Sequence, residues 1–281
     1  MLAIVGFIVV LGSVLTGYIL SGGDPAILFQ PNEFIIIFGA ASGAFAASCT
    51  SYAFRMALKN LKWVFAPKQM TKATYLQTLS VLYALFSKMH REGIISIEKD
   101  IEDPKSSSIF SSSPLMAKDD LACYFIGDTL RTFLTTGKAD ELGELMDTDV
   151  ESISTELEIA PHNLEKMAES LPGMGIVAAV MGVVITMSYI SEPPEVLGHH
   201  IGAALLGTFL GILLCYGIFA PMAIKLSNLQ TERVVYFRFI KEAVMASVRG
   251  LSPIIALEYG RRAIPPYFRP TFTEMESAMK G

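Results

Sequence analysis

Four long stretches of this sequence contain no Asp, Glu, Lys or Arg, and they limit the possible folds more than any other feature. They cover residues 2–20, 34–54, 172–190 and 201–224. A helix of about 20 residues crosses the roughly 30 Å hydrocarbon core of a bilayer. We therefore predict an all-α, polytopic membrane protein with four transmembrane helices and a helical domain between helices two and three.

The positive charges predict how these helices are oriented. All 22 Lys and Arg residues lie in two segments, 13 of them in residues 55–166 and 9 in residues 225–280. The connectors 21–33 and 191–200 contain four acids and no base. Since Lys and Arg are enriched in cytoplasmic loops, both basic segments and both chain termini are predicted to be cytoplasmic. Four bases follow the second stretch directly: Arg55, Lys59, Lys62 and Lys68.

This distribution divides the chain into four predicted parts. Residues 1–54 and 172–224 each hold two membrane helices with a short outer loop, 55–171 form a cytoplasmic domain, and 225–281 form a cytoplasmic helix and tail. Within the second and fourth parts, apolar periodicity predicts helices over residues 73–91, 121–135, 140–145, 161–170 and 225–248. Residues 109–114 are typical of a loop.

The tail has two interpretations. Gly250 and Pro253 are expected to end the last helix, and Arg261 and Arg262 are followed by three prolines. We predict an irregular, solvated tail. The alternatives are contact with anionic headgroups and folding back onto the acidic domain.

Several functional classes are excluded. A net charge of −5 argues against a nucleic-acid binder. Cys49, Cys123 and Cys215 are scattered, which indicates neither a disulfide framework nor a metal site. No glycine-rich phosphate loop, nucleophile elbow or zinc-protease motif is present. We therefore expect no catalytic residue, cofactor or metal, and no enzyme activity.

The missing intramembrane charge also constrains function. Ion-driven membrane proteins usually hold an ionisable side chain within the membrane, and none lies in the four predicted spans. The chain therefore either moves no ions or lines a pathway whose carboxylate comes from another polypeptide.

Polar and helix-breaking residues in the last two spans are the candidates for such a pathway. Pro172 is expected at the first turn of the third span, whereas Pro221 is expected to kink a helix that continues past it. The two form a hinge pair or are unrelated. Thr208 lies within the membrane, where its hydroxyl bonds its own helix or holds water or an ion. His199 and His200 are assigned to the outer membrane interface.

Small residues predict close helix packing. Gly39 and Gly43 form one small-xxx-small pair, and Gly207 and Gly211 form another. Such pairs let helix backbones approach closely, within one chain or between subunits.

Three stretches resemble the flagellar motor stator proteins of the MotA family, in the MotA/TolQ/ExbB proton channel superfamily. These are ALLGTFLGIL at 204–213 followed by Pro221, SLPGMGIVAAVMGVV at 170–184, and Gly22-Gly23 with QPNE at 30–33. The four-span layout with a large loop between spans two and three also matches, so the resemblance covers nearly the whole chain.

The resemblance implies an ion-conducting stator subunit of the bacterial inner membrane that converts proton flow into torque. It implies a homopentamer around two copies of a MotB-like, peptidoglycan-anchored partner, whose single span supplies the proton-binding Asp. Pro172 and Pro221 then support the conformational change, and Thr208 lines the pathway. Sodium-driven relatives carry Thr where this chain has Ala179, so the resemblance points to H⁺ as the coupling ion.

The same resemblance implies a contact with the rotor switch protein FliG through charged residues of the cytoplasmic loop. Glu98 matches the family acid directly. The family arginine aligns with His90, and Arg91 follows it. We assign the basic role to Arg91, because a His is mostly neutral at pH 7. Without the resemblance, these residues read as a solvated charged loop.

Three other classes remain as alternatives: a secondary transporter subunit, an energy-transducing stator of outer-membrane transport, and a purely structural membrane scaffold. No inverted repeat or intramembrane substrate charge supports the first.

Overall fold

The computed structural model describes residues 2–67 and 69–280, so Lys68 of the basic cluster lies outside the described residues. The described residues form helices and no strand. Four helical segments of this part are long and apolar enough to cross a membrane: Leu2–Leu20, Pro25–Ser48, Ala139–Met187 and Pro194–Val248. The prediction of an all-α protein with four membrane helices is confirmed.

The chain divides into two compact units. The first comprises residues 1–68 and 157–229 and is called the membrane unit here. The second comprises residues 69–156 and 230–281 and is called the polar unit. Each unit is described by itself below.

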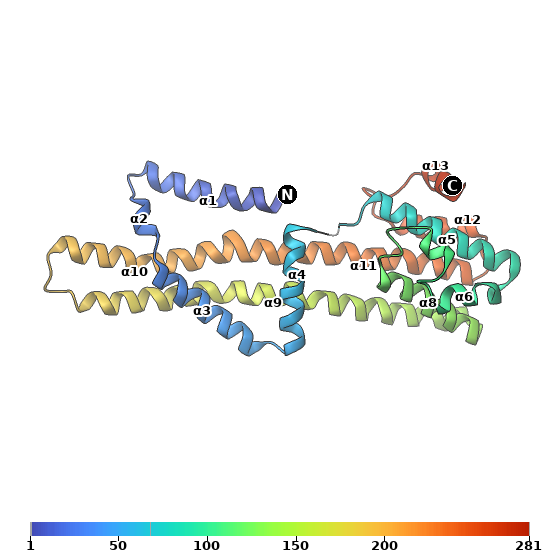
Figure 1. The fold of residues 1–281 in the computed structure, drawn as a ribbon, viewed down its shortest axis with the longest axis horizontal. Coiled ribbons are helices and arrows are strands. Elements are labelled where there is room, and N and C mark those ends of the chain that lie inside the picture. The colour runs from blue at the N-terminus through green and yellow to red at the C-terminus, as the bar shows by residue number, and fades with distance from the viewer. Residues whose placement is uncertain (1, 68, 281) are drawn as a thin grey trace. The chain divides into compact units, whose positions relative to one another are not determined.

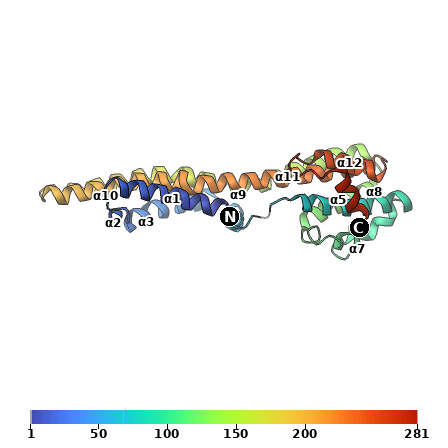
Figure 2. The same cartoon turned by 90° about the horizontal axis from the view of Figure 1, so that it is seen from above.

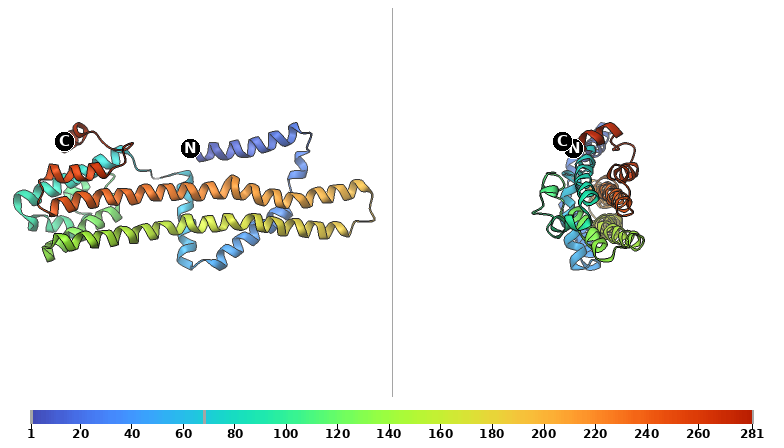
Figure 3. Two further views of the ribbon diagram at one scale, coloured as in Figure 1. Left: turned by 180° about the vertical axis from the view of Figure 1, so that it is seen from behind. Right: turned by 90° about the vertical axis from the view of Figure 1, so that its right-hand side faces the viewer.

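The membrane unit is built on two long antiparallel helices. The second part of α9 (Ala139–Met187) lies beside α10 (Pro194–Leu214), which continues through a π-helical turn, η2 (Cys215–Phe219), into α11 (Ala220–Val248). Figures 1 and 3 show this pair, joined by a turn at one end. The remaining elements are α1 (Leu2–Leu20), α2 (Pro25–Leu28), α3 (Pro31–Ser48) and α4 (Ser51–Phe65).

The second membrane helix differs from the predicted span 34–54. Helix α3 begins at Pro31, whose fixed φ suits a first helical turn. It ends at Ser48, and Cys49 is extended, with φ −96° and ψ 146°. Thr50 then caps a separate helix, α4, because its Oγ1 accepts a hydrogen bond from the N–H of Ala53 at 3.2 Å. The absence of charge alone did not reveal this break.

The predicted helices 140–145 and 161–170 and the third span are parts of one helix, α9. Pro161 and Pro172 both lie inside it, so the expectation that Pro172 opens a helix is wrong. Each proline removes one backbone N–H from the helix. A continuous buried stripe that includes Ala160, Leu164 and Leu171 packs the helix on both sides of these interruptions.

The polar unit begins with α5 (Lys72–Glu92) and α8 (Asp120–Thr136), which match the predicted helices 73–91 and 121–135. Between them are η1 (Ile94–Ile97), α6 (Glu98–Glu102) and α7 (Ser108–Ser111), so a short helix occupies part of the predicted loop 109–114. The core of the polar unit is aromatic: the Tyr75 ring centroid lies 5.8 Å from that of Tyr236 and 5.4 Å from that of Phe239. Figure 2 shows α5, α8 and α12 of this unit from above.

The C-terminal tail is folded, which corrects the prediction of an irregular, solvated segment. It forms α12 (Pro253–Ala263) and α13 (Phe272–Lys280), and both contact α5. A β-carbon on Gly260 would lie 2.8 Å from the Cβ of Ala243, so α12 packs closely on α11. The alternative of folding back onto the acidic domain is the one that the structure supports.

Two local signals explain the tail. Thr271 and Glu274 form a capping box, in which the N–H of Glu274 donates to Thr271 Oγ1 at 3.2 Å and the N–H of Thr271 donates to Glu274 Oε2 at 2.7 Å. Arg261 is not solvated but bonds Glu258 (Nε to Oε2, 2.6 Å). Hydrogen bonds from Arg261, together with those from Arg262, lower the pKa of Glu258 to about 2, against the effect of its burial.

A buried ion pair joins α8 to α11 in the polar unit. The carboxylate of Asp119 accepts hydrogen bonds from both terminal nitrogens of Arg233. It also accepts one from the N–H of Ala122, so Asp119 caps the N-terminus of α8. Both side chains are at least 85% buried. Removing one partner of such a pair leaves an unpaired buried charge, at a cost of about 3–5 kcal/mol.

We therefore expect Asp119→Ala to lower the free energy of unfolding of the polar unit by about 3–5 kcal/mol. The neighbouring Asp120→Ala is the matched control, because the Asp120–Lys105 pair is more than half exposed and such pairs contribute about 0–1 kcal/mol. Thermal unfolding in detergent, followed by circular dichroism, measures both. Equal losses for the two variants would contradict the assignment.

Candidate functional site

The last two membrane helices contact each other through their backbones. A β-carbon added to Gly175 of α9 would lie 2.7 Å from the carbonyl oxygen of Gly207, and one added to Gly211 of α10 would lie 2.7 Å from the carbonyl oxygen of Leu171. Atoms cannot approach this closely, so only glycine fits at these positions. The small-xxx-small pair Gly207/Gly211 thus packs within the chain. Around Gly39 and Gly43 there is open space.

One carboxyl group lies against this glycine contact. Glu33 of α3 is 9% exposed and shares one helix face with Ile37, Ala41 and Phe45. A β-carbon on Gly207 would lie 3.0 Å from Glu33 Oε2, and one on Gly182 would lie 3.6 Å from Oε1. Oε2 has no hydrogen-bond partner among the described residues.

Glu33 corrects the expectation that no ionisable side chain lies within the spans. The sequence pattern places Glu33 at the end of the connector 21–33, whereas α3 begins at Pro31 and carries Glu33 in its first turn, among its buried residues. An unpaired carboxylate among apolar helices is costly and usually marks function. The spacing Glu33–Ile37–Ala41–Phe45, one residue every four, was a sequence signal of this inward face.

Ala179 lies beside the same contact, and Thr208 is next to Gly207 in the chain. The backbone nitrogen of Ala179 would lie 2.8 Å from a β-carbon on Gly207. Thr208 is half-buried, and its hydroxyl makes no hydrogen bond to any described residue. The structure therefore does not show the first predicted role of Thr208, a hydrogen bond from its hydroxyl to the backbone of its own helix.

Of the two prolines, Pro172 lies inside the glycine contact, between Leu171 and Gly175, and Pro221 lies beyond Gly211 in the chain. Residues next to them share one apolar cluster: Leu171 precedes Pro172, Ala220 precedes Pro221, and both pack with Cys215. The π-helical turn Cys215–Phe219 lies directly before Pro221. Proline cannot donate a hydrogen bond to the preceding turn, and a widened turn accommodates that loss. The irregularity expected at Pro221 is thus this π turn.

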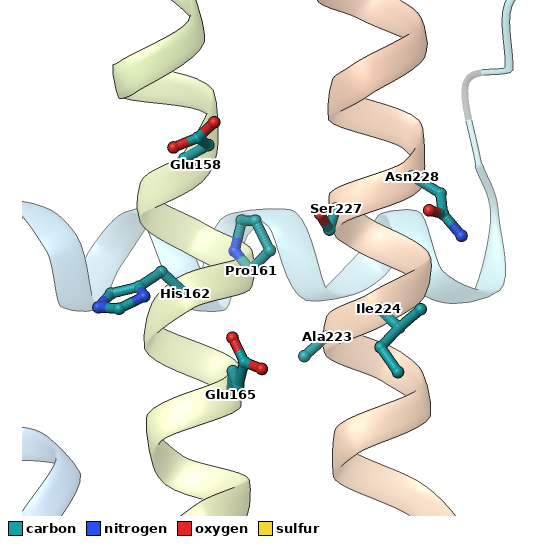
Figure 4. Close-up of a pocket in the computed structure, with 8 residues that line it drawn as sticks. All are labelled: Glu158, Pro161, His162, Glu165, Ala223, Ile224, Ser227 and Asn228. Atoms are coloured by element: carbon teal, nitrogen blue, oxygen red, sulfur yellow. The ribbon is translucent and has the colours of Figure 1, made fainter.

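A cavity of about 270 Å³ with a mixed polar and apolar lining lies between α9 and α11 in the membrane unit. Figure 4 shows its lining, from α9 on one side and from α11 on the other: Glu158, Pro161, His162, Glu165, Ala223, Ile224, Ser227 and Asn228. The three titratable side chains are exposed. Within residues 2–67 and 69–280, no cluster of three or more His, Cys, Asp or Glu side chains is arranged to hold a metal ion.

The charged residues assigned to the rotor lie on one turn of the polar unit. His90 and Arg91 end α5, Gly93 reverses the chain with φ +85°, and Glu98 begins α6. The side chains of His90, Arg91 and Glu98 are all exposed. Between them Ile95 is 71% exposed, which makes it an apolar residue at the tip of the turn.

A buried carboxylate holds this turn. Asp100 is 8% exposed and accepts hydrogen bonds from Lys88 Nζ at 2.8 Å and from Ser107 Oγ at 2.6 Å. Lys88 belongs to α5 and Asp100 to α6, so the pair fixes the helix that carries Arg91 against the helix that carries Glu98. Sequence reasoning did not single out either residue.

Comparisons with known proteins cover the whole chain. The family profile described as "Motility protein A N-terminal" matches residues 4–93, and that described as "MotA/TolQ/ExbB proton channel family" matches residues 118–238. Motility protein A of Salmonella typhimurium is 37% identical over 282 residues, which is 100% of this chain and 96% of that protein. Motility protein A of Escherichia coli is 38% identical with the same coverage.

Two solved structures share the fold. The structure of C. jejuni MotAB has a TM-score of 0.77 at 20% identity and covers 94% of this chain and 95% of its own. The flagellar MotAB stator complex from Bacillus subtilis has a TM-score of 0.75 at 20% identity, with 96% and 98% coverage. Because relatives above 30% identity match along its full length, this chain belongs to the motility protein A family of MotA/TolQ/ExbB proton channels.

Proposed function

We propose that the chain is the proton-conducting stator subunit of a bacterial flagellar motor and works with a MotB-like partner. The observation that carries this proposal is the full-length similarity to motility protein A, joined to a membrane unit with a buried, unpaired carboxyl beside a glycine contact. A channel subunit of this kind is not an enzyme: it couples ion movement to a change of shape and breaks no covalent bond.

In this proposal the proton path runs along α9 and α10. The partner's single span supplies the Asp that binds the proton, Thr208 lines the path beside it, and Glu33 binds and releases protons beside the glycine contact. Two independent features support this arrangement: the hydroxyl of Thr208 and Glu33 Oε2 have no partner among the described residues. Each proton crossing releases about 2.3 kcal/mol per 100 mV.

The conformational step is assigned to Pro172 and Pro221. Both interrupt the hydrogen bonding of long helices, and the π turn before Pro221 already departs from α-helical geometry. Helices deform most readily where such bonds are missing. The step ends as a push on the rotor switch protein FliG through Arg91 and Glu98.

For the assembly, we propose five copies of this chain around two copies of the partner, in the bacterial inner membrane. Residues 55–171 and 225–281 would then lie in the cytoplasm with both termini, and the parts 1–54 and 172–224 would hold the spans. The confinement of all Lys and Arg to 55–166 and 225–280 supports this orientation.

Glu33 provides the first test. Glu33→Gln keeps the shape of the side chain but cannot release a proton, so we expect proton flux and swimming speed to fall about tenfold, equivalent to about 1.4 kcal/mol on the limiting barrier. Glu33→Asp should retain part of the flux. Glu195→Gln, which changes an exposed acid in the first turn of α10, serves as the control. Cytoplasmic acidification and swimming are measured with the partner co-expressed. Wild-type flux in Glu33→Gln would refute the role.

The rotor contact is tested by separating two neighbouring residues. Arg91→Gln should reduce the fraction of swimming cells severalfold, because it removes a charge that acts on the rotor only within a Debye length of about 8 Å. Proton flux should stay unchanged, because Arg91 lies in the polar unit and not along the proposed proton path. His90→Gln, the matched control, should swim normally. If His90→Gln fails and Arg91→Gln swims, the basic role belongs to His90.

The coupling ion is tested without a variant. The proton channel family and Ala179 lead us to expect the same swimming speed in sodium-free and sodium-rich media at constant proton-motive force. Collapse of the proton gradient should stop the motor within seconds. Speed that follows the sodium concentration would overturn the assignment of protons.

A further inference from the structure

Helix α4 of the membrane unit has one face fixed in the core. Val64 is fully buried among Leu164 of α9 and Met222 of α11, and Ala57 packs with Met167 of α9. Since these contacts are spaced along the helix, α4 cannot rotate about its axis. The orientation of its other faces is therefore set by the packing of this unit.

The face opposite this core contact is basic. Arg55, Lys59 and Lys62 follow one another at intervals of four and three residues, so they lie on the same side of the helix. All three side chains are exposed. None of them forms an ion pair or hydrogen bond with any residue of the described ranges. Three cations without partners thus lie within about two turns of one rigid helix.

An apolar edge runs beside these cations. Leu58 is 56% exposed and Phe65 is 46% exposed. The Phe65 ring centroid lies 6.3 Å from that of Phe7 in α1, an apolar helix long enough to span a membrane. No residue of α1 between Leu2 and Leu20 is buried within the structure. At Phe65, the Leu58–Phe65 edge therefore meets α1, an unburied helix that is apolar enough to span a membrane.

We propose that α4 lies in the headgroup layer of the membrane, and that Arg55, Lys59 and Lys62 form a binding site for anionic phospholipid headgroups. Only two residues, Cys49 and Thr50, separate the end of the membrane helix α3 from the start of α4, so α4 remains at the bilayer surface. An amphipathic helix with cations beside an apolar edge binds at such an interface. The exposed apolar edge favours a lipid surface over an acidic protein. This site goes beyond the stator function and does not depend on it.

The expected strength follows from the charges. A Lys or Arg near an anionic surface contributes about a fivefold gain in association, and salt screens this gain within a Debye length. We therefore expect phosphatidylglycerol to associate with the protein about fivefold more strongly than phosphatidylcholine, since headgroups engage these cations singly or in pairs.

The experiment uses the full chain with its MotB-like partner in phosphatidylcholine bilayers that contain traces of spin-labelled phosphatidylglycerol or phosphatidylcholine. Electron paramagnetic resonance measures the motionally restricted fraction of each lipid. The triple variant Arg55→Gln, Lys59→Gln, Lys62→Gln should lose the preference for phosphatidylglycerol. Each single variant should lose part of it, and exposed single substitutions of this kind leave folding nearly unchanged.

The matched control removes the same charges elsewhere. Lys99, Lys118 and Arg249 are two lysines and one arginine of the polar unit, all exposed and without an ion pair to the described residues. Their triple Gln variant should keep the wild-type lipid preference. The proposal is overturned if the α4 variants, single and triple, keep the preference, or if the control variant loses as much of it.

Discussion

Helices α9 and α10 are in close contact at four glycines: Gly175, Gly182, Gly207 and Gly211. At each of them, an added β-carbon would lie within 3.0 Å of an atom of the other helix. In a bilayer, where no hydrophobic force drives helices together, such close packing is a main source of association. The contact also sets the register of the two helices. It brings the backbone of Ala179 to Gly207 and leaves beside both the space that Glu33 fills. The membrane unit therefore depends on positions that tolerate only glycine.

The sequence predicted the elements that follow from composition and periodicity. Runs without charge are enough to predict the four spans, and a periodic repeat of apolar residues is enough to predict α5 and α8. What it did not predict depends on local chemistry or on tertiary packing. Thr50 ends a span that composition would extend to residue 54, because a cap competes with an apolar run. The prolines of α9 do not end it, because packing on both sides of them sustains the helix. Thr271 and Glu274 have the spacing of a capping box, and α13 forms despite the three prolines that precede it.

Glu33 shows how a shift of a few residues changes a functional conclusion. A span that begins at residue 34, as the absence of charge predicts, contains no acid. With α3 beginning at Pro31, Glu33 becomes a buried carboxyl inside the helix bundle. An acid in the first turn of a helix is favoured by the helix dipole, which offsets part of the cost of burial. In the proposed function, Glu33 in the first turn of α3 therefore has a role separate from that of the partner's Asp.

Close backbone contact and interrupted hydrogen bonding occur together along these helices. The glycine contact holds α9 and α10 at close range and includes Leu171, whose neighbour Pro172 removes one backbone N–H from α9. The π turn and Pro221 interrupt regular α-helical hydrogen bonding beyond Gly211. In the polar unit, the Lys88–Asp100 pair, shielded by Ser107, stiffens the turn that carries Arg91 and Glu98. In the proposed function, a stiff turn at Arg91 and Glu98 would transmit a displacement of the helices to the rotor, whereas a soft turn would dissipate it.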